Sequence, residues 1–316
     1  MSQTRRTLAG VAANPNIGAV LLVGLGCETN QADVLAQHIP ARKPIEVLGI
    51  QEAGGSDVVR RLGIEIVEKF AKDREAESRT LQGAEGLCVG VLGVEADERA
   101  YRAVYPAVGA VIDRLVTAGA RVILGVPGAM APRADALIDR AVTGDAQKRL
   151  AQLAEGLTRK AWLEASQSDR VVRPYSDQER ARAEKELPLS GSAPVASVVA
   201  YAERPSGPGL HLMTVSQNPV EAMTGLVAGG ANIILVAASR GLFAGSIASP
   251  SVVVAPAAER TSALDEFVDH RVESEDTSLE AERILRRLLD VASGELCVAE
   301  RERLGQFAIS QLWTSF

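Results

Sequence analysis

The stretch Asn218–Gly241, NPVEAMTGLVAGGANIILVAASRG, contains a helix, a tight stop and a strand in direct succession. Pro219 suits the first turn of a helix, and apolar residues recur after it at helical spacing. Gly229 and Gly230 then end the helix. The run Ile233–Val236 is continuously apolar, which is typical of a strand buried on both faces of a parallel sheet. The stretch therefore predicts one helix-to-strand unit of an α/β layer.

The same succession occurs twice more in the chain. A helical pattern opens at Tyr105–Gly109, ends at Ala118-Gly119 and leads into the apolar run Ala120–Gly125. The turn Asn14–Asn16 precedes another apolar run, Ile17–Gly24. Three transitions of this kind favour an α/β fold with a parallel sheet and Rossmann-like layers.

The remaining elements follow from the same patterns. Short apolar runs bounded by turn residues predict strands, and apolar residues at helical spacing predict helices. Strands are expected at Ile45–Ile50, Leu87–Leu92, Leu210–Val215 and Val252–Val254. Helices are expected at residues 4–13, from an N-cap at Ser56 through Ile64, Val67 and Phe70, and at Ser176–Glu186, Val195–Ala202, Glu259–Val268 and Leu279–Ala292, where Ser293-Gly294 is the stop.

Chain length and a charged linker predict two domains. A chain of 316 residues exceeds the size at which single cores stop growing, about 250–300 residues. The charged run Lys72–Arg79 is the best linker in the first third. We expect a smaller α/β domain at residues 1–80 and a larger one at residues 81–316. The larger domain should carry an exposed, charged helical excursion at about residues 169–189, with its charges on a solvated face.

Composition narrows the class of partner and the compartment. A net charge of −6 with 3% aromatic residues disfavours a nucleic-acid surface, which needs clustered Lys and Arg. No apolar segment is long enough to span a membrane. Three cysteines, an odd number, predict a reducing, cytoplasmic setting. Arg5-Arg6 followed by an apolar stretch up to Cys27 imitates an export signal, but Asn14–Asn16 interrupts that stretch.

Polar residues follow the first two predicted strands. Cys27 and Glu28 come after one strand, and Gln51 and Glu52 come after the next. Ligands of parallel sheets gather where strands end, and paired carboxylates can act as acid and base or hold a divalent cation. The alternative is that these are turn residues that bond backbone N–H groups.

Two other kinds of site fit less well. Gly24-Leu25-Gly26 invites a dinucleotide interpretation, but Thr29 occupies the third glycine position. His211 lies mid-strand and is expected to be packed, whereas His38 and His270 are expected to be exposed. No histidine has metal-ligand spacing.

Several segments resemble the altronate and galactarate dehydratases, a family that also includes sulfolactate sulfo-lyase. The resemblance covers nearly the whole chain, although the family's upstream region has no counterpart. It implies elimination of water or sulfite from a 2-hydroxy acid, in which a base removes the proton next to a carboxylate and an acid assists the leaving group. The matching segments are GLGCETNQAD (Gly24–Asp33), IQEAGGS (Ile50–Ser56), NPVEAMTGLVAGGANII (Asn218–Ile234), SPSVVVA (Ser249–Ala255) and ASGE (Ala292–Glu295).

The resemblance also implies site residues and a metal. A divalent cation such as Fe²⁺ would stabilise the enediolate, although the chain could also work with no cofactor; no metal ligand is assigned. We expect the strand ends to form one shared pocket. By resemblance, the expected catalytic residues are Glu28, Glu52 and Asp97, and the expected substrate-binding residues are Cys27, Gln31, Gln51, Asn232 and Arg240.

The chain departs from the family pattern at several polar positions. Where the family has a Cys-Gly-Gly-Ser-Asp run, this chain reads Gly93–Asp97 and keeps only the aspartate. Val126 and Ala129 stand where the family has two glutamates, and Ala244–Ser246 replaces a cysteine loop. Two hypotheses follow: a divergent lyase that binds a small hydroxy acid, or a catalytically silent homologue that pairs with a homologous subunit in a homo- or hetero-oligomer.

Overall fold

A computed structural model describes residues 2–41, 43–126, 130–154, 175–257 and 263–310. Its main feature is a seven-stranded sheet in which every neighbouring pair is parallel. The α/β parallel-sheet prediction is therefore confirmed. In spatial order the strands are β10 (His270–Val272), β9 (Ser251–Pro256), β7 (Ile233–Ala238), β3 (Cys88–Val94), β4 (Arg121–Val126), β6 (Gly209–Thr214) and β5 (Val195–Val199).

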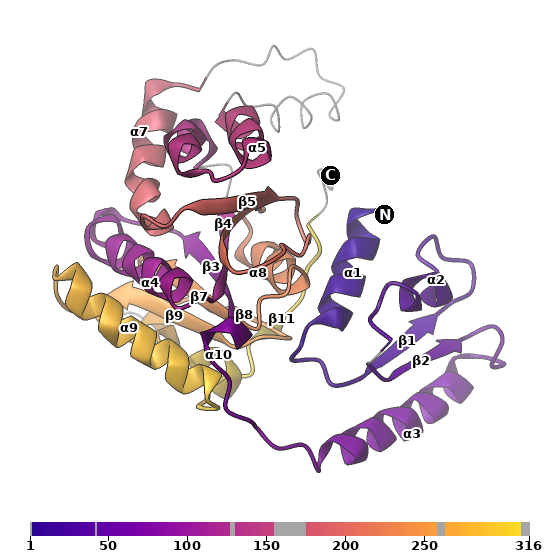
Figure 1. Cartoon of the computed structure of the whole chain (residues 1–316). Coiled ribbons are helices and arrows are strands. Elements are labelled where there is room, and N and C mark those ends of the chain that lie inside the picture. Colours follow the sequence, from indigo (N-terminus) through magenta and orange to yellow (C-terminus); the bar gives the residue numbers. More distant parts are fainter. Residues whose placement is uncertain (1, 42, 127–129, 155–174, 258–262, 311–316) are drawn as a thin grey trace.

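Helices cover both faces of this sheet (Figure 1). On β3, Val89 and Val91 join the core beneath α4 and α9, whereas Cys88 and Leu92 join the core beneath α8. Alternate residues of one strand thus serve both layers. The described helices are α1 (Gln3–Ala13), α2 (Ala32–Ala36), α3 (Ser56–Arg74), α4 (Tyr105–Thr117), α5 (Gly144–Ala154), α7 (Asp177–Glu186), α8 (Pro219–Ala228), α9 (Thr277–Ala292) and α10 (Val298–Arg301). Short helices are η1 (Ala84–Gly86), η2 (Ala100–Val104), η3 (Ala131–Arg140), η4 (Leu187–Ser190) and η5 (Ala263–Phe267).

A second, smaller sheet pairs β1 (Val20–Gly24) with β2 (Ile45–Gly49) in parallel, between α2 and α3. It lies apart from the large sheet in Figure 1. In α3 the side chains of Ile64 and Val67 are 49% and 52% exposed, so they do not form the inward face expected of them. The N-cap of α3 is Gly55 rather than Ser56. The domain boundary at residue 80 stays a prediction.

Other differences from the expected elements lie at the edges of the large sheet. Val195–Val199 is the edge strand β5, not a helix, because β-branched valines pair beside β6. His270 lies in the short edge strand β10, which was not expected. The expected helix at Glu259–Val268 falls partly outside the described residues. No helix within the described ranges is long and apolar enough to cross a membrane.

The small sheet is attached to the large sheet through α1, the helix that precedes it in the chain. A Cβ atom on Gly10 would lie 2.4 Å from the carbonyl oxygen of Ala228, so α1 and α8 meet backbone to backbone. After α1 ends, the Nδ2 atom of buried Asn14 donates to Val227 O at 3.0 Å and Ala231 O at 2.8 Å. These bonds satisfy carbonyl groups at the end of α8 and beyond it. The packing of α1 on α8 therefore depends on Gly10, which has no side chain, and on the buried side-chain amide of Asn14.

A small substitution at Gly10 should test this docking. Gly10→Ala should lower the free energy of unfolding by about 1–3 kcal/mol, because the added methyl group forces α1 and α8 apart. Gly144→Ala is the matched control, because its Cβ would meet no atom within 4 Å. Urea unfolding of both variants measures the difference. Equal stability of the two variants would contradict the close packing of α1 on α8.

Candidate functional site

The connections of the large sheet change direction between β3 and β7. After β3 the chain passes to β4 on one side, whereas after β7 the next strand of this sheet is β9, on the other side. Adjacent strands with diverging connections leave a crevice at their carboxyl ends, where α/β proteins bind ligands. The residues that follow these two strands, Glu95–Asp97 and Ser239-Arg240, are therefore the candidate site.

An ion pair links the segments that follow β3 and β7, where the topology predicts this crevice. Arg240 Nη2 donates to Glu95 Oε2 at 2.7 Å, and Nε donates to the same atom at 3.3 Å. Glu95 has a φ of 42°, which is unusual for a residue with a side chain, and Ser239 Oγ donates to its carbonyl oxygen. The side chains of Arg240 and Glu95 are 58% and 67% exposed, so the pair contributes only about 0–1 kcal/mol. Arg240 can therefore exchange partners at little cost.

Asp97 is oriented by the start of the next helical turn. Its Oδ1 atom accepts from the backbone N–H groups of Arg99 at 3.1 Å and Ala100 at 2.9 Å. Arg99 Nη2 contacts Oδ2 at 3.5 Å, and its Nη1 donates to Ala257 O at 3.3 Å. Because Ala257 follows β9, three strand ends are linked at this edge of the sheet. The structure thus brings two predicted site residues, Asp97 and Arg240, to the carboxyl ends of two adjacent strands.

The helix α7 of the charged excursion packs beside the same edge, where Lys185 pairs with Glu98 after β3. Tyr105 lies against β3: a Cβ on Gly93 of β3 would lie 2.5 Å from its hydroxyl. Glu186 of α7 is 6% exposed, and burial raises its pKa against the opposing effect of Arg182, whose Nε lies 3.7 Å from Oε1. Burial also raises the pKa of Tyr105, and the charge of Glu186 adds to that shift. The expected helix is confirmed, but its charges are not all solvated, because Glu186 faces the core.

Four of the other predicted residues lie at the carboxyl end of the small sheet: Cys27, Glu28, Gln51 and Glu52. Glu28 Oε2 accepts from the Gly26 N–H at 2.6 Å. Backbone N–H groups, first its own and then that of Gly26, hold the pKa of Glu28 below its usual value. Gln51 Oε1 lies close to Gly26, so the two loops meet, whereas Glu52 and Cys27 are exposed. Glu28 therefore acts as a turn residue that accepts hydrogen bonds from backbone N–H groups, which is the alternative that the sequence left open for it.

The two carboxyl edges do not face one another. Asn16 Nδ2 donates to the carbonyl oxygens of Asn232 at 2.8 Å and Ala248 at 3.0 Å, which lie before β7 and β9. The small sheet starts four residues later, at Val20, so its amino end faces the amino edge of the large sheet. In Figure 1 the carboxyl ends of β1 and β2 point away from the large sheet. The expected shared pocket is therefore wrong for a single chain.

Two further expectations can be placed. The side chain of Asn232 bonds Cys88 N at 3.0 Å and Gly86 O at 3.0 Å, so it ties strands together at the amino edge, away from the crevice. Gln31 ends the loop before α2 with no side-chain capping bond. Within the described part of the chain, no three His, Cys, Asp or Glu side chains are grouped to hold a metal ion. These residues therefore do not fit the Fe²⁺ that the resemblance implies.

The histidines and cysteines are structural or exposed. His211 is buried and bonds Ser197 Oγ at 2.8 Å and Gly207 O at 3.3 Å, as expected of a packed strand residue. His270, expected to be exposed, is half-buried against Glu280 at 3.1 Å. Burial raises the pKa of the Cys88 and Cys297 thiols to about 11, whereas Cys27 is exposed.

Sequence reasoning missed Glu95 as a partner of Arg240. Its position directly after a buried strand was the available signal. The pairing itself joins residues 145 positions apart and has no local pattern.

Two profiles of one family match this chain. The D-galactarate dehydratase/altronate hydrolase second domain matches residues 1–75, and the D-galactarate/altronate dehydratase C-terminal domain matches residues 184–315. Galactarate dehydratase (L-threo-forming) of Escherichia coli K12 is 25% identical over 311 residues, which are 92% of this chain and 59% of that protein. Altronate dehydratase of Bacillus subtilis 168 is 23% identical over 97% of this chain and 63% of its own length. The chain thus spans about three fifths of these relatives. Arg240 lies inside a matched range, and Glu95 and Asp97 lie outside both.

The buried carboxyl of Glu186 predicts a pH-dependent stability. Because its folded pKa is raised, the folded state is favoured most below the ordinary pKa and loses stability as pH rises through the raised value. Glu186→Gln removes that loss, so its unfolding midpoint should exceed that of the parent at about pH 7.5 and match it at about pH 4. Thermal unfolding at both pH values measures this. Glu65→Gln, on the exposed face of α3, is the control, and an equal gain there would refute the assignment.

Proposed function

The chain belongs to the D-galactarate dehydratase/altronate hydrolase family, and from this premise we propose that it binds a small 2-hydroxy acid between β3 and β7 and eliminates water from it. The observation that carries the proposal is the exposed Arg240–Glu95 pair at the crevice. The names of the relatives suggest sugar acids such as galactarate and altronate as ligands.

Arg240 supplies the recognition element. A guanidinium presents a planar fork that matches a carboxylate with two parallel hydrogen bonds. The carboxylate of Glu95 now occupies that fork, with both contacts to one oxygen. A substrate carboxylate would replace Glu95 on Arg240, and both groups are exposed enough for this exchange. Binding would thereby free Glu95 beside the carbon next to the substrate carboxylate.

The two acidic residues then take different parts in the reaction. Released Glu95 would accept the proton from the carbon next to the carboxylate, where a base must act in such an elimination. Its protonated carboxyl would then give that proton to the hydroxyl on the following carbon, which leaves as water as the C–O bond breaks and the C=C bond of the enol forms; the enol then becomes the keto acid. Asp97, fixed by two backbone N–H groups, would accept a hydrogen bond from a substrate hydroxyl and orient the chain of carbon atoms. No step is assigned to a metal, because the described residues offer no set of ligands for one.

A second candidate function is ligand binding without turnover, beside a homologous subunit. The opposed carboxyl edges favour it: Glu28 and Glu52 lie at one edge, and Asp97 and Arg240 lie at the other. A site that combined both groups would require a second chain. This arrangement supports a homo- or hetero-oligomer, in which the small sheet of one subunit meets the crevice of another.

Binding and turnover can be separated by experiment. Galactarate and altronate should bind the parent protein in calorimetry, and Arg240→Ala should weaken binding by about tenfold or more, because a hydrogen bond to a charged group contributes about 1.5–3 kcal/mol. Glu95→Gln should retain binding and lose turnover, which is measured as keto-acid formation. Arg286→Ala, an exposed arginine of α9 paired with Glu282, is the control.

The outcomes discriminate between the two functions. Binding with turnover that depends on Glu95 supports the lyase. Binding without turnover by the protein alone, or with turnover only after a homologous subunit is added, supports the second function. An unchanged affinity together with an unchanged number of binding sites per chain in Arg240→Ala would refute the β3–β7 crevice as a site.

A further inference from the structure

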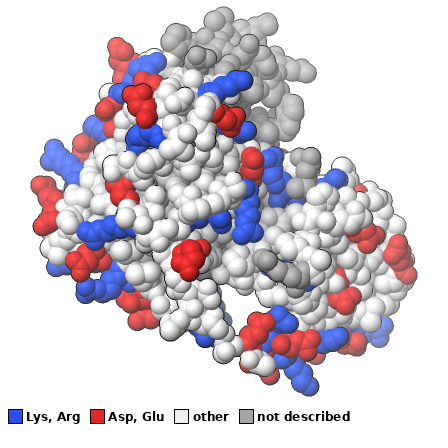
Figure 2. All heavy atoms as spheres, viewed as in Figure 1, with Lys and Arg blue, Asp and Glu red and all other residues white. Residues whose placement is uncertain are grey.

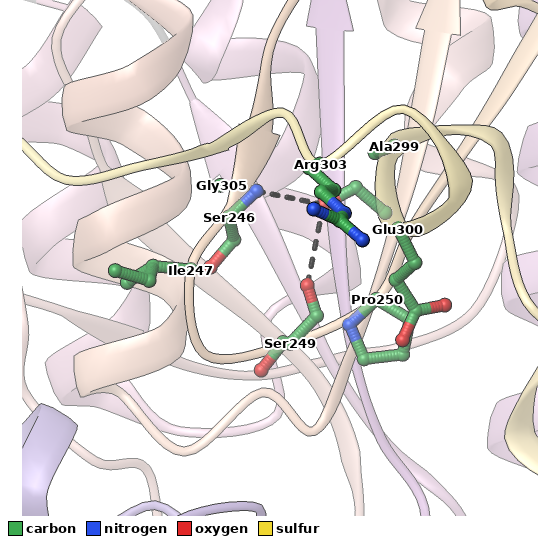
Figure 3. Close-up of a pocket in the computed structure, with 9 residues that line it drawn as sticks. Ser246, Ile247, Ser249, Pro250, Ala299, Glu300, Arg303 and Gly305 are labelled. Carbon is green, nitrogen blue, oxygen red and sulfur yellow. Dashed lines mark hydrogen bonds between the residues drawn. The ribbon is translucent and has the colours of Figure 1, made fainter.

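A second cavity lies at the opposite end of the large sheet. It has a volume of about 340 Å³ and lies between the loop that leads into β9 and the end of α10 (Figure 3). Its walls are Ser246, Ile247, Ser249, Pro250, Ser251, Ala299, Glu300, Arg303 and Gly305. It adjoins a wider cleft of about 680 Å³ along the same Ser246–Pro250 wall. The volume suits a small molecule. Since strand amino ends form this wall, the cavity is separate from the β3–β7 crevice.

Arg303 stands in this cavity with an unusual backbone. Its φ of 55° lies in the left-handed region, just after α10, where glycine is the common residue. Its N–H donates to Glu300 O at 3.2 Å, and Leu304 N donates to Ala299 O at 2.8 Å, so the conformation is fixed by the helix end. A side chain at this position costs stability. An arginine at a position where glycine would be unstrained points to a use for its side chain.

The guanidinium of Arg303 has no hydrogen-bond or ion-pair partner among the residues that the structure describes. Figure 3 shows it lying across the cavity between the Ser246–Ser249 loop and Glu300. Other arginines near this end of the sheet are paired: Arg287 contacts Asp269 at 3.1 Å and Glu295 at 2.9 Å. Arg303 is exposed, and an unpaired guanidinium on the wall of an open cavity favours an anionic ligand that fits its fork.

The remaining walls add acceptors and a hydroxyl. The carboxylate of Glu300 bonds Cys297 N at 3.0 Å through one oxygen. Ser246 Oγ accepts from Ala248 N at 3.2 Å, which leaves its own proton for a ligand. A plain anion would be repelled by Glu300, whereas a ligand that carries hydroxyl groups could donate to it. We propose that this cavity binds a small hydroxy carboxylate, with its carboxylate on Arg303 and a hydroxyl on Glu300.

The test uses the full chain in an Arg240→Ala background, so that the crevice does not contribute. Galactarate should still bind in calorimetry, and adding Arg303→Ala should weaken that binding by about tenfold or more. Arg301→Ala is the matched control, because that side chain bonds Leu296 O from the same short helix. Adipate, which has the same carbon chain and no hydroxyls, and inorganic phosphate should bind weakly.

A second variant separates binding from folding. Arg303→Gly should lose the ligand and raise the thermal unfolding midpoint by about 2 °C, because glycine adopts positive φ freely. Galactarate binding that is unaffected by Arg303→Ala would overturn the inference, as would adipate or phosphate binding as tightly as galactarate. Failure of the β3–β7 crevice would appear in the Arg240→Ala variant alone, so the two proposals fail independently.

Discussion

The contact of α1 with α8 sets the geometry of the whole chain. Gly10 lets the two helices approach through their backbones, and the amides of Asn14 and Asn16 then bond carbonyl groups at the amino edge of the large sheet. Because buried carbonyl groups must find donors, these bonds leave the small sheet few ways to attach. The amino ends of both sheets consequently meet, and their carboxyl ends point apart.

Charged side chains of both signs are interspersed over α3 and α9 on the face in Figure 2.

The buried strands were predictable because their residue pattern is local. Ile233–Val236 and Leu87–Leu92 are continuous apolar runs, and both became central strands. The edge strands β5 and β10 were missed for a physical reason: an edge strand is short, partly exposed and stabilised by one neighbour, so its own sequence specifies it weakly. The N-cap of α3 at Gly55 was missed in a similar way, since Ser56 satisfied the local rule.

The candidate site was only half predictable. The rule that ligands gather at strand ends located Asp97 and Arg240, because it depends on strands that the pattern identifies. It could not show that Glu28 and Glu52 lie at another edge, since the relative placement of the two sheets depends on the amides of Asn14 and Asn16 and on Gly10. Left-handed backbone at a residue with a side chain is likewise invisible in a sequence. Glu95 and Arg303 share it: Glu95 pairs with Arg240, and Arg303 lines a cavity.

The different settings of the three thiols make one of them chemically distinct. Cys88 and Cys297 are buried, with pKa values of about 11, so at neutral pH they are protonated and shielded. Cys27 is exposed at the carboxyl end of the small sheet. An alkylating fluorophore therefore has a single point of attachment in the native protein without any engineered cysteine. The emission of a fluorophore on Cys27 would change when a ligand or another subunit binds near the small sheet.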